Sequence, residues 1–74
     1  MLKASQARAA RAMVRMTVHE LARRAGVAPY TITRLEAGET LQSRTLEAVR
    51  SALEQAGAEF FENGVRMRRR LKDL

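Results

Sequence analysis

Two short amphipathic segments separated by Gly26 constrain this chain more than any other feature of its sequence. The first runs over residues 18–25 and places three apolar residues on one helical face: Leu21, Ala22 and Ala25. Gly26 ends this segment, since the position after a helix often needs a positive φ, and Pro29 favours the start of the next one. Gly38 ends the second segment, over residues 28–37, in the same way. The sequence therefore predicts two helices joined by a tight turn.

The residues around this turn also predict how the two helices pack. Two helices cross at a steep angle only where the turn is sharp and the residue at the crossing is small. Ala22 supplies the small contact, and Val27 fills the corner between the helices. Ile32 and Leu35 form the buried face of the second helix and hold it against the first.

Two further helices are predicted on either side of this pair. Residues 3–15 are rich in Ala and Arg, which favour helix formation, and place Ala7, Ala10 and Val14 at helical spacing. Thr17 and Glu20 then form a capping box for the helix over 18–25. A fourth helix begins after a cap at Gln42 or Ser43 and ends before Gly57. Its apolar face carries three residues: Leu46, Val49 and Leu53.

The last segment changes character and predicts a β-hairpin around Asn63-Gly64. These two residues tolerate positive φ and are typical of a two-residue hairpin turn. This turn places Glu62 opposite Val65, Glu59 opposite Arg68, and Phe60 opposite Met67. The alternative is a fifth helix over residues 65–73, since that stretch also contains good helix formers.

Composition limits the classes of function that the chain can have. Its 74 residues make one small domain, and 14 basic against 8 acidic residues give a net charge of +6. This excess points to a polyanionic partner, most often nucleic acid. There is no Cys and a single His, so disulfides, thiolate zinc sites and His clusters are excluded. We expect a cytoplasmic protein that is not an enzyme, with no metal, cofactor, membrane or small-molecule partner.

The stretch TVHELARRAGVAPYTITRLEAG, residues 17–38, resembles the helix-turn-helix of the phage-repressor and Cro-like family, also called the XRE family. Residues 5–56 match the helical domain of that family. The tail GAEFFENGVRMR resembles the C-terminal extension of many small bacterial members. The resemblance implies an all-α bundle of four to five helices with a short C-terminal β-hairpin. It divides the chain into a DNA-binding domain, 1–57, and a hairpin with a basic tail, 58–74.

The resemblance also implies which residues face DNA. The recognition helix is residues 28–37, and its base-reading positions fall on Pro29, Tyr30, Thr33 and Arg34. Arg34 is suited to a bidentate contact with guanine. Val18 stands where the family usually has a DNA-contacting Gln, and it joins Ala28 as a possible further contact.

Other positions match places where family members contact phosphate: Thr17, Thr31, Thr40 and Arg44. Free amides at the N-termini of the second and third helices are suited to phosphate as well. Arg11 and Glu36 match a buried ion pair between the first and third helices of the family. Surface arginines such as Arg8 are expected to be solvated.

The family implies a transcriptional regulator, most simply a repressor, that binds double-stranded DNA as a homodimer on a palindromic operator. The predicted dimer interface is in the tail, at Phe60, Phe61, Val65 and Met67. The alternative is an antitoxin-type interaction module that also binds its own promoter. Order in residues 58–74 separates the two, because a self-paired hairpin favours the regulator and a disordered tail favours the antitoxin.

Overall fold

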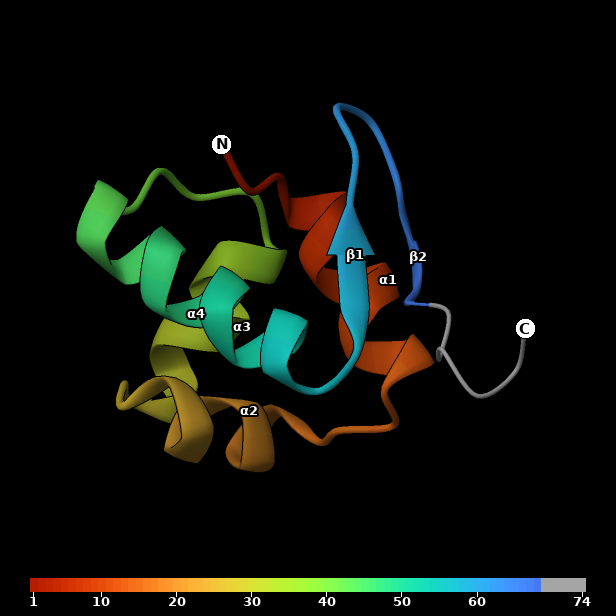
Figure 1. Ribbon diagram of the computed structural model, residues 1–74. Coiled ribbons are helices and arrows are strands. Elements are labelled where there is room, and N and C mark those ends of the chain that lie inside the picture. Colours follow the sequence, from red (N-terminus) through yellow and green to blue (C-terminus); the bar gives the residue numbers. More distant parts are fainter. Residues whose placement is uncertain (69–74) are drawn as a thin grey trace.

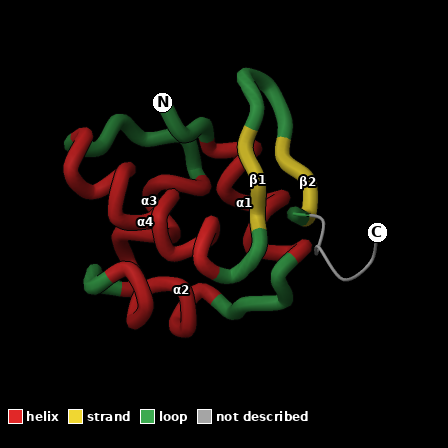
Figure 2. Tube along the Cα trace, viewed as in Figure 1, coloured by secondary structure: helices red, strands yellow, loops and turns green. Residues whose placement is uncertain are grey.

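The computed structural model describes residues 1–68, which form four helices and one two-stranded antiparallel sheet (Figure 1). In chain order the elements are α1 (Ala4–Met13), α2 (Val18–Ala25), α3 (Pro29–Glu36), α4 (Ser43–Gln55), β1 (Ala58–Phe60) and β2 (Val65–Met67). The helices form the body of the molecule, and the two strands pack beside α1 and α4 (Figure 2). A mostly helical domain followed by a short hairpin is thus confirmed.

The core lies where the four helices meet. Its largest fully buried side chains come from α2, α3 and α4: Leu21, Ile32, Val49 and Leu53. From α1 come Ala7 and Ala10, both without solvent exposure, and their small size lets α1 approach the other helices closely. Ala58 of β1 is buried in the same cluster. The helices and the hairpin therefore share one hydrophobic core.

The end of α2 has the backbone geometry that the sequence predicts. The amide of Val27 donates to the carbonyl of Ala22 at 3.0 Å, and the amide of Gly26 donates to that of Arg23 at 3.3 Å. This Schellman pattern requires the left-handed region at the residue after the helix, where glycine carries no steric cost. Gly26 has φ +73°, and Gly38 takes φ +93° at the end of α3. Both glycines therefore act as predicted.

The first helix is shorter than predicted because it ends with the same pattern on a non-glycine residue. Arg15 has φ +58°, its amide donates to the carbonyl of Ala12, and the amide of Met16 donates to that of Arg11. The helix therefore ends at Met13, and the predicted continuation to residue 15 is wrong. No glycine stands at this turn, and the surrounding residues favour a helix, so the sequence does not indicate where α1 ends.

The hairpin forms, but its predicted register is wrong by two residues. Phe60 pairs with Val65, Glu59 pairs with Arg66, and Ala58 pairs with Met67. The turn is centred on residues 62–63 and is closed by a hydrogen bond of 2.9 Å from the amide of Phe61 to the carbonyl of Gly64. Neither Asn63 nor Gly64 has a positive φ, so the expected Asn-Gly turn is not used. A shift of two residues leaves every side chain on its original face.

Gln6 of α1 gives a physical reason for this register. Its side-chain nitrogen donates to the carbonyls of Phe61 and Gly64, at 2.6 and 3.1 Å, and the residue is 4% exposed. The amide therefore holds both ends of the turn against α1. The alternative of a helix is wrong at residues 65–67, which form β2, and its remainder from residue 69 lies outside the described residues.

Candidate nucleic-acid interface

The turn between α2 and α3 fixes the orientation of α3 on the body of the domain. Ala22 is buried at the helix contact, and Val27 packs against the core in the corner after Gly26. On α3, Ile32 and Leu35 are buried. Because one face of this eight-residue helix is used by the core, its opposite face is directed to solvent.

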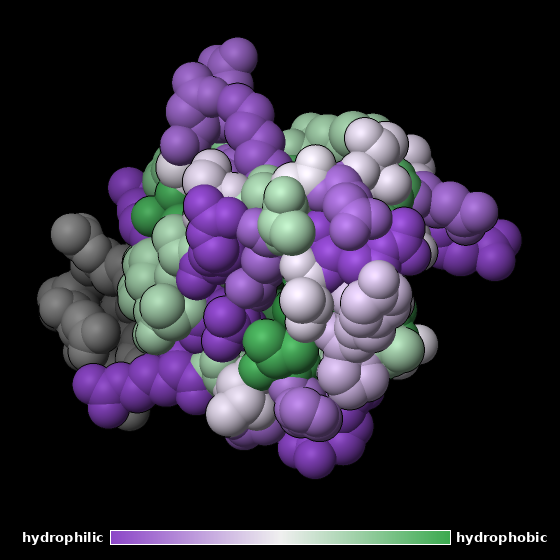
Figure 3. Space-filling view, turned by 180° about the vertical axis from the view of Figure 1, so that it is seen from behind, coloured by the Kyte–Doolittle hydropathy of each residue, from purple (hydrophilic) through white to green (hydrophobic). Residues whose placement is uncertain are grey.

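The predicted base-reading residues lie on or near this exposed face. Pro29 and Thr33 are exposed, Tyr30 is 69% exposed, and Arg34 is half-buried. α3 lies behind α4 in Figure 1, and Figure 3 shows the molecule from behind, on the side where α3 lies. That side is mostly hydrophilic or intermediate, and hydrophobic side chains occur there only in separate small areas (Figure 3). The predicted base-reading side chains Pro29, Tyr30 and Thr33 are therefore accessible from solvent.

Arg34 is already engaged on this surface. Its Nε donates to Oε1 of Glu39 at 2.9 Å, and its guanidinium carbon lies 5.8 Å from the ring centroid of Tyr30. The hydrogen bond to Glu39 is the main cause that raises the pKa of Arg34. Sequence reasoning missed Glu39. The signal that could have found it is its place directly after Gly38, because a glycine that ends a helix turns the next residue back toward that helix.

The N-terminus of α2 is capped by its own side chains. Thr17 Oγ1 accepts from the amide of Glu20 at 3.0 Å, and the Glu20 carboxylate accepts from the amide of Thr17 at 2.9 Å. The backbone hydrogen bond from Thr17 is the main cause that lowers the pKa of Glu20, and the Thr17 hydroxyl adds to it. The expectation of a free amide is therefore wrong at Glu20. Val18, the possible DNA contact, is half-buried against the core.

The N-termini of α3 and α4 differ from that of α2 because no side chain caps them. Ala28 precedes α3 and is exposed, while Thr31 is half-buried and its amide donates to the carbonyl of Ala28 at 2.9 Å. Thr40 and Arg44 are exposed on either side of Gln42, the residue that precedes α4. These positions leave the first turn of α4 open to an anion from solvent.

Arg11 and Glu36 form the expected ion pair between α1 and α3. Nε and Nη2 of Arg11 donate to the two carboxylate oxygens of Glu36 at 2.7 and 2.9 Å, and Nη1 donates to the carbonyl of Met16 at 3.1 Å. The side chains are 25% and 10% exposed, so the pair is largely but not fully buried. The hydrogen bond to Glu36 raises the pKa of Arg11.

A second arginine of α1 also contacts the end of α3. Arg8 Nη1 donates to the backbone carbonyl of Glu36, which is the last residue of that helix. Sequence reasoning left Arg8 in solvent, although its spacing of three residues from Arg11 places both on one side of α1. Two arginines therefore attach the C-terminal end of α3 to the first helix.

The four residues of the predicted dimer interface divide into two pairs. Phe60 and Val65 are half-buried and pack against the domain's own core. Phe61 and Met67 are exposed. The guanidinium of Arg66 lies 4.6 Å from the ring centroid of Phe61. Only part of the predicted apolar surface is therefore available to a second molecule.

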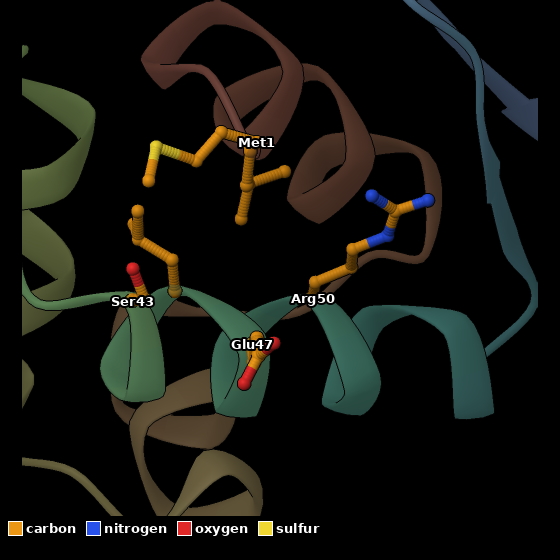
Figure 4. A pocket seen from close by; sticks show the side chains of 6 residues that line it. Met1, Ser43, Glu47 and Arg50 are labelled. Carbon is orange, nitrogen blue, oxygen red and sulfur yellow. The ribbon is translucent and has the colours of Figure 1, made fainter.

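A shallow hollow of about 400 Å³ lies between the N-terminal residues and α4, on another part of the surface (Figure 4). Met1 reaches over it, and Ser43, Glu47 and Arg50 lie along α4 at its edge. Arg50 extends toward the hairpin, where its guanidinium lies 5.3 Å from the ring centroid of Phe60. The charged side chains of the hollow thus diverge.

Comparison with models of known protein families gives no match, and no curated protein sequence matches the chain significantly. Within residues 1–68, no helix combines the length and the apolar character needed to cross a membrane. The functional interpretation therefore depends on the geometry of the α2–α3 surface and on the charge of the chain.

Proposed function

We propose that the protein is a sequence-specific double-stranded DNA-binding regulator that places α3 in the major groove. The observation that carries this proposal is the solvent-facing side of α3, which presents Tyr30, Thr33 and Arg34. The helix is fixed at its start by the turn at Gly26 and at its end by the Arg11–Glu36 pair. A major groove about 12 Å wide admits one helix and presents a distinct pattern of donors and acceptors at each base pair. A helix that is fixed at both ends and presents hydrogen-bonding side chains to solvent suits that geometry.

The charge of the chain and the uncapped N-terminus of α4 support a role for phosphate contacts. The chain carries a net charge of +6, and Arg44 is exposed in the first turn of α4, which no side chain caps. Thr40 is exposed just before that helix. Amide groups of an open helix N-terminus, together with a guanidinium, bind a phosphate through hydrogen bonds and charge. Such contacts set the register of the protein on DNA, while α3 reads the bases.

A homodimer is part of the proposal because one short helix reads too few base pairs to select a site in a genome. Two copies related by a two-fold axis read half-sites about 34 Å apart. The exposed side chains of Phe61 and Met67 make the hairpin the proposed contact between copies. Phe61→Ser is expected to shift the protein from dimer to monomer in sedimentation while its helical circular dichroism is retained. A variant that remains a dimer would place the interface in the helices.

The hairpin also favours a regulator over an antitoxin-type module. Residues 58–67 pair with one another and pack on α1 and α4, and Gln6 holds the turn. A segment that wraps a partner protein is expected to be disordered before binding. Self-association of an ordered hairpin is therefore the better supported use of this tail.

The proposal is tested by protection of the DNA that flanks the protein's own gene. The wild-type chain is expected to protect a short palindromic site, as a repressor of that promoter would. Arg34→Ala should weaken binding to this site roughly 10- to 100-fold and affect random DNA far less, whereas Arg44→Ala should weaken binding to both equally. The absence of any protected site, together with affinity that does not change between 50 and 200 mM salt, would exclude this function.

A further inference from the structure

Glu39 lies beside the residue that is best placed to read a base. The positive φ of Gly38 turns the chain back over the last turn of α3, so that the amide of Glu39 donates to the carbonyl of Arg34 at 3.1 Å. The carboxylate of the same residue accepts from Nε of Arg34 at 2.9 Å. Backbone and side chain of Glu39 therefore both return to Arg34. The end of the helix therefore places Glu39 beside Arg34.

The pairing leaves the outer part of the guanidinium available. Glu39 receives a hydrogen bond from Nε, and the two terminal nitrogens of Arg34 make no hydrogen bond to residues 1–68. Guanine offers two acceptors, O6 and N7, to a pair of parallel donors. The terminal nitrogens can supply both donors while Nε stays bonded to the carboxylate. The ring centroid of Tyr30 lies 5.8 Å from the guanidinium carbon.

The carboxylate has a second effect, because it places a negative charge directly beside the guanidinium of Arg34. Its side chain is 50% exposed, so solvent and ligands can reach the carboxylate. A phosphate that competes for Arg34 must displace Glu39 or approach it, and like charges repel. Guanine is uncharged and avoids this repulsion.

On the basis of the proposed DNA-binding function, we propose that Glu39 is a specificity-determining residue that positions Arg34 for guanine and disfavours phosphate. It braces the guanidinium, so less side-chain freedom is lost when the correct base is bound. It also lowers affinity for DNA that lacks this base. Glu39 acts through Arg34 and needs no contact with the base itself.

The test compares Glu39→Gln with Glu54→Gln in the full-length chain. Arg50 Nε donates to Glu54 at 3.1 Å, with side chains 42% and 43% exposed, close to the 39% and 50% of the Arg34–Glu39 pair. Both variants gain one unit of net charge, but Glu54 is on α4. The probes are a 20-bp duplex enriched from a randomised pool by the wild type, the same duplex with its Arg34-dependent base pair replaced, and a random-sequence duplex.

Glu39→Gln is expected to bind the random duplex about threefold to fivefold more tightly than Glu54→Gln does, and to lose discrimination at the Arg34-dependent pair by a similar factor. In an Arg34→Ala background, Glu39→Gln should leave discrimination at that pair unchanged, because the residue it positions is gone. That coupling distinguishes positioning from a general change of charge or fold.

Equal behaviour of Glu39→Gln and Glu54→Gln on all three probes would overturn the role of Glu39 and leave the DNA-binding function intact. Failure of the wild type to enrich any sequence would overturn both. The proposal would also be refuted if Glu39→Gln reduced discrimination by the same factor in the Arg34→Ala background as in the wild type, since Glu39 would then act without Arg34.

Discussion

Replacing Glu36 with Gln tests whether α3 is fixed to α1 by the ion pair. Exposed ion pairs contribute about 0–1 kcal/mol, whereas breaking a buried one costs about 3–5 kcal/mol. With side chains 25% and 10% exposed and two hydrogen bonds of 2.7 and 2.9 Å, the Arg11–Glu36 pair lies between these cases. Glu36→Gln removes the negative charge and leaves Arg11 uncompensated. We expect the free energy of unfolding to fall by about 2 kcal/mol.

The assay is urea denaturation followed by helical circular dichroism at pH 7. For a domain of this size, a slope of about 1 kcal/mol/M converts the expected loss into a midpoint about 2 M lower. Glu54→Gln is the matched control, because its exposed pair with Arg50, four residues away on α4, should contribute less than about 0.5 kcal/mol. Equal midpoint shifts for the two variants would show that the Arg11–Glu36 pair does not fix α3 to α1.

Three further predictions concern stability. Arg15→Gly should raise the free energy of unfolding by about 0.5–1 kcal/mol, because a left-handed φ of +58° is less favourable for a residue with a side chain than for glycine. Urea denaturation measures this, with Arg15→Ala as the control. Gln6→Leu should lower the free energy of unfolding by about 1–3 kcal/mol, since two turn carbonyls lose their donor. Amide exchange should also speed up more in the hairpin than in α2, and an equal increase in both regions would contradict this. The folded-state pKa of Glu20 is lowered, so its contribution is present above the ordinary value of 4.5 and is lost as the pH falls through the folded value. Wild type should therefore lose more stability than Glu20→Gln between pH 6 and pH 3, and parallel losses would contradict the capping interpretation.

The helical part of the fold could be predicted because its signals are local. The Thr17–Glu20 capping box and the two glycines after α2 and α3 act within one turn of a helix, so residue type alone indicates them. The end of α1 was missed because Arg15 takes a conformation that its side chain disfavours. Nothing in the residue type marks such a position.

The parts that sequence analysis missed depend on contacts between distant segments. The hairpin register is set together with Gln6, which lies 55 residues before Phe61, and the Asn63-Gly64 signal does not include that contact. The partner of Arg34 was also missed, because the return of Glu39 over α3 follows from the three-dimensional path after Gly38. The exposed face of α3 could be predicted, since the buried positions of an amphipathic helix define the opposite side.

Selection from a randomised duplex pool at 150 mM salt tests the proposal that α3 reads bases in double-stranded DNA. We expect an enriched inverted repeat with half-site centres about one helical turn, 34 Å, apart. In each half, one guanine position should lose its enrichment when Arg34→Ala replaces the wild type in the selection. Recovery of no enriched sequence from a protein that stays folded, or an enriched sequence that is identical for wild type and Arg34→Ala, would contradict it.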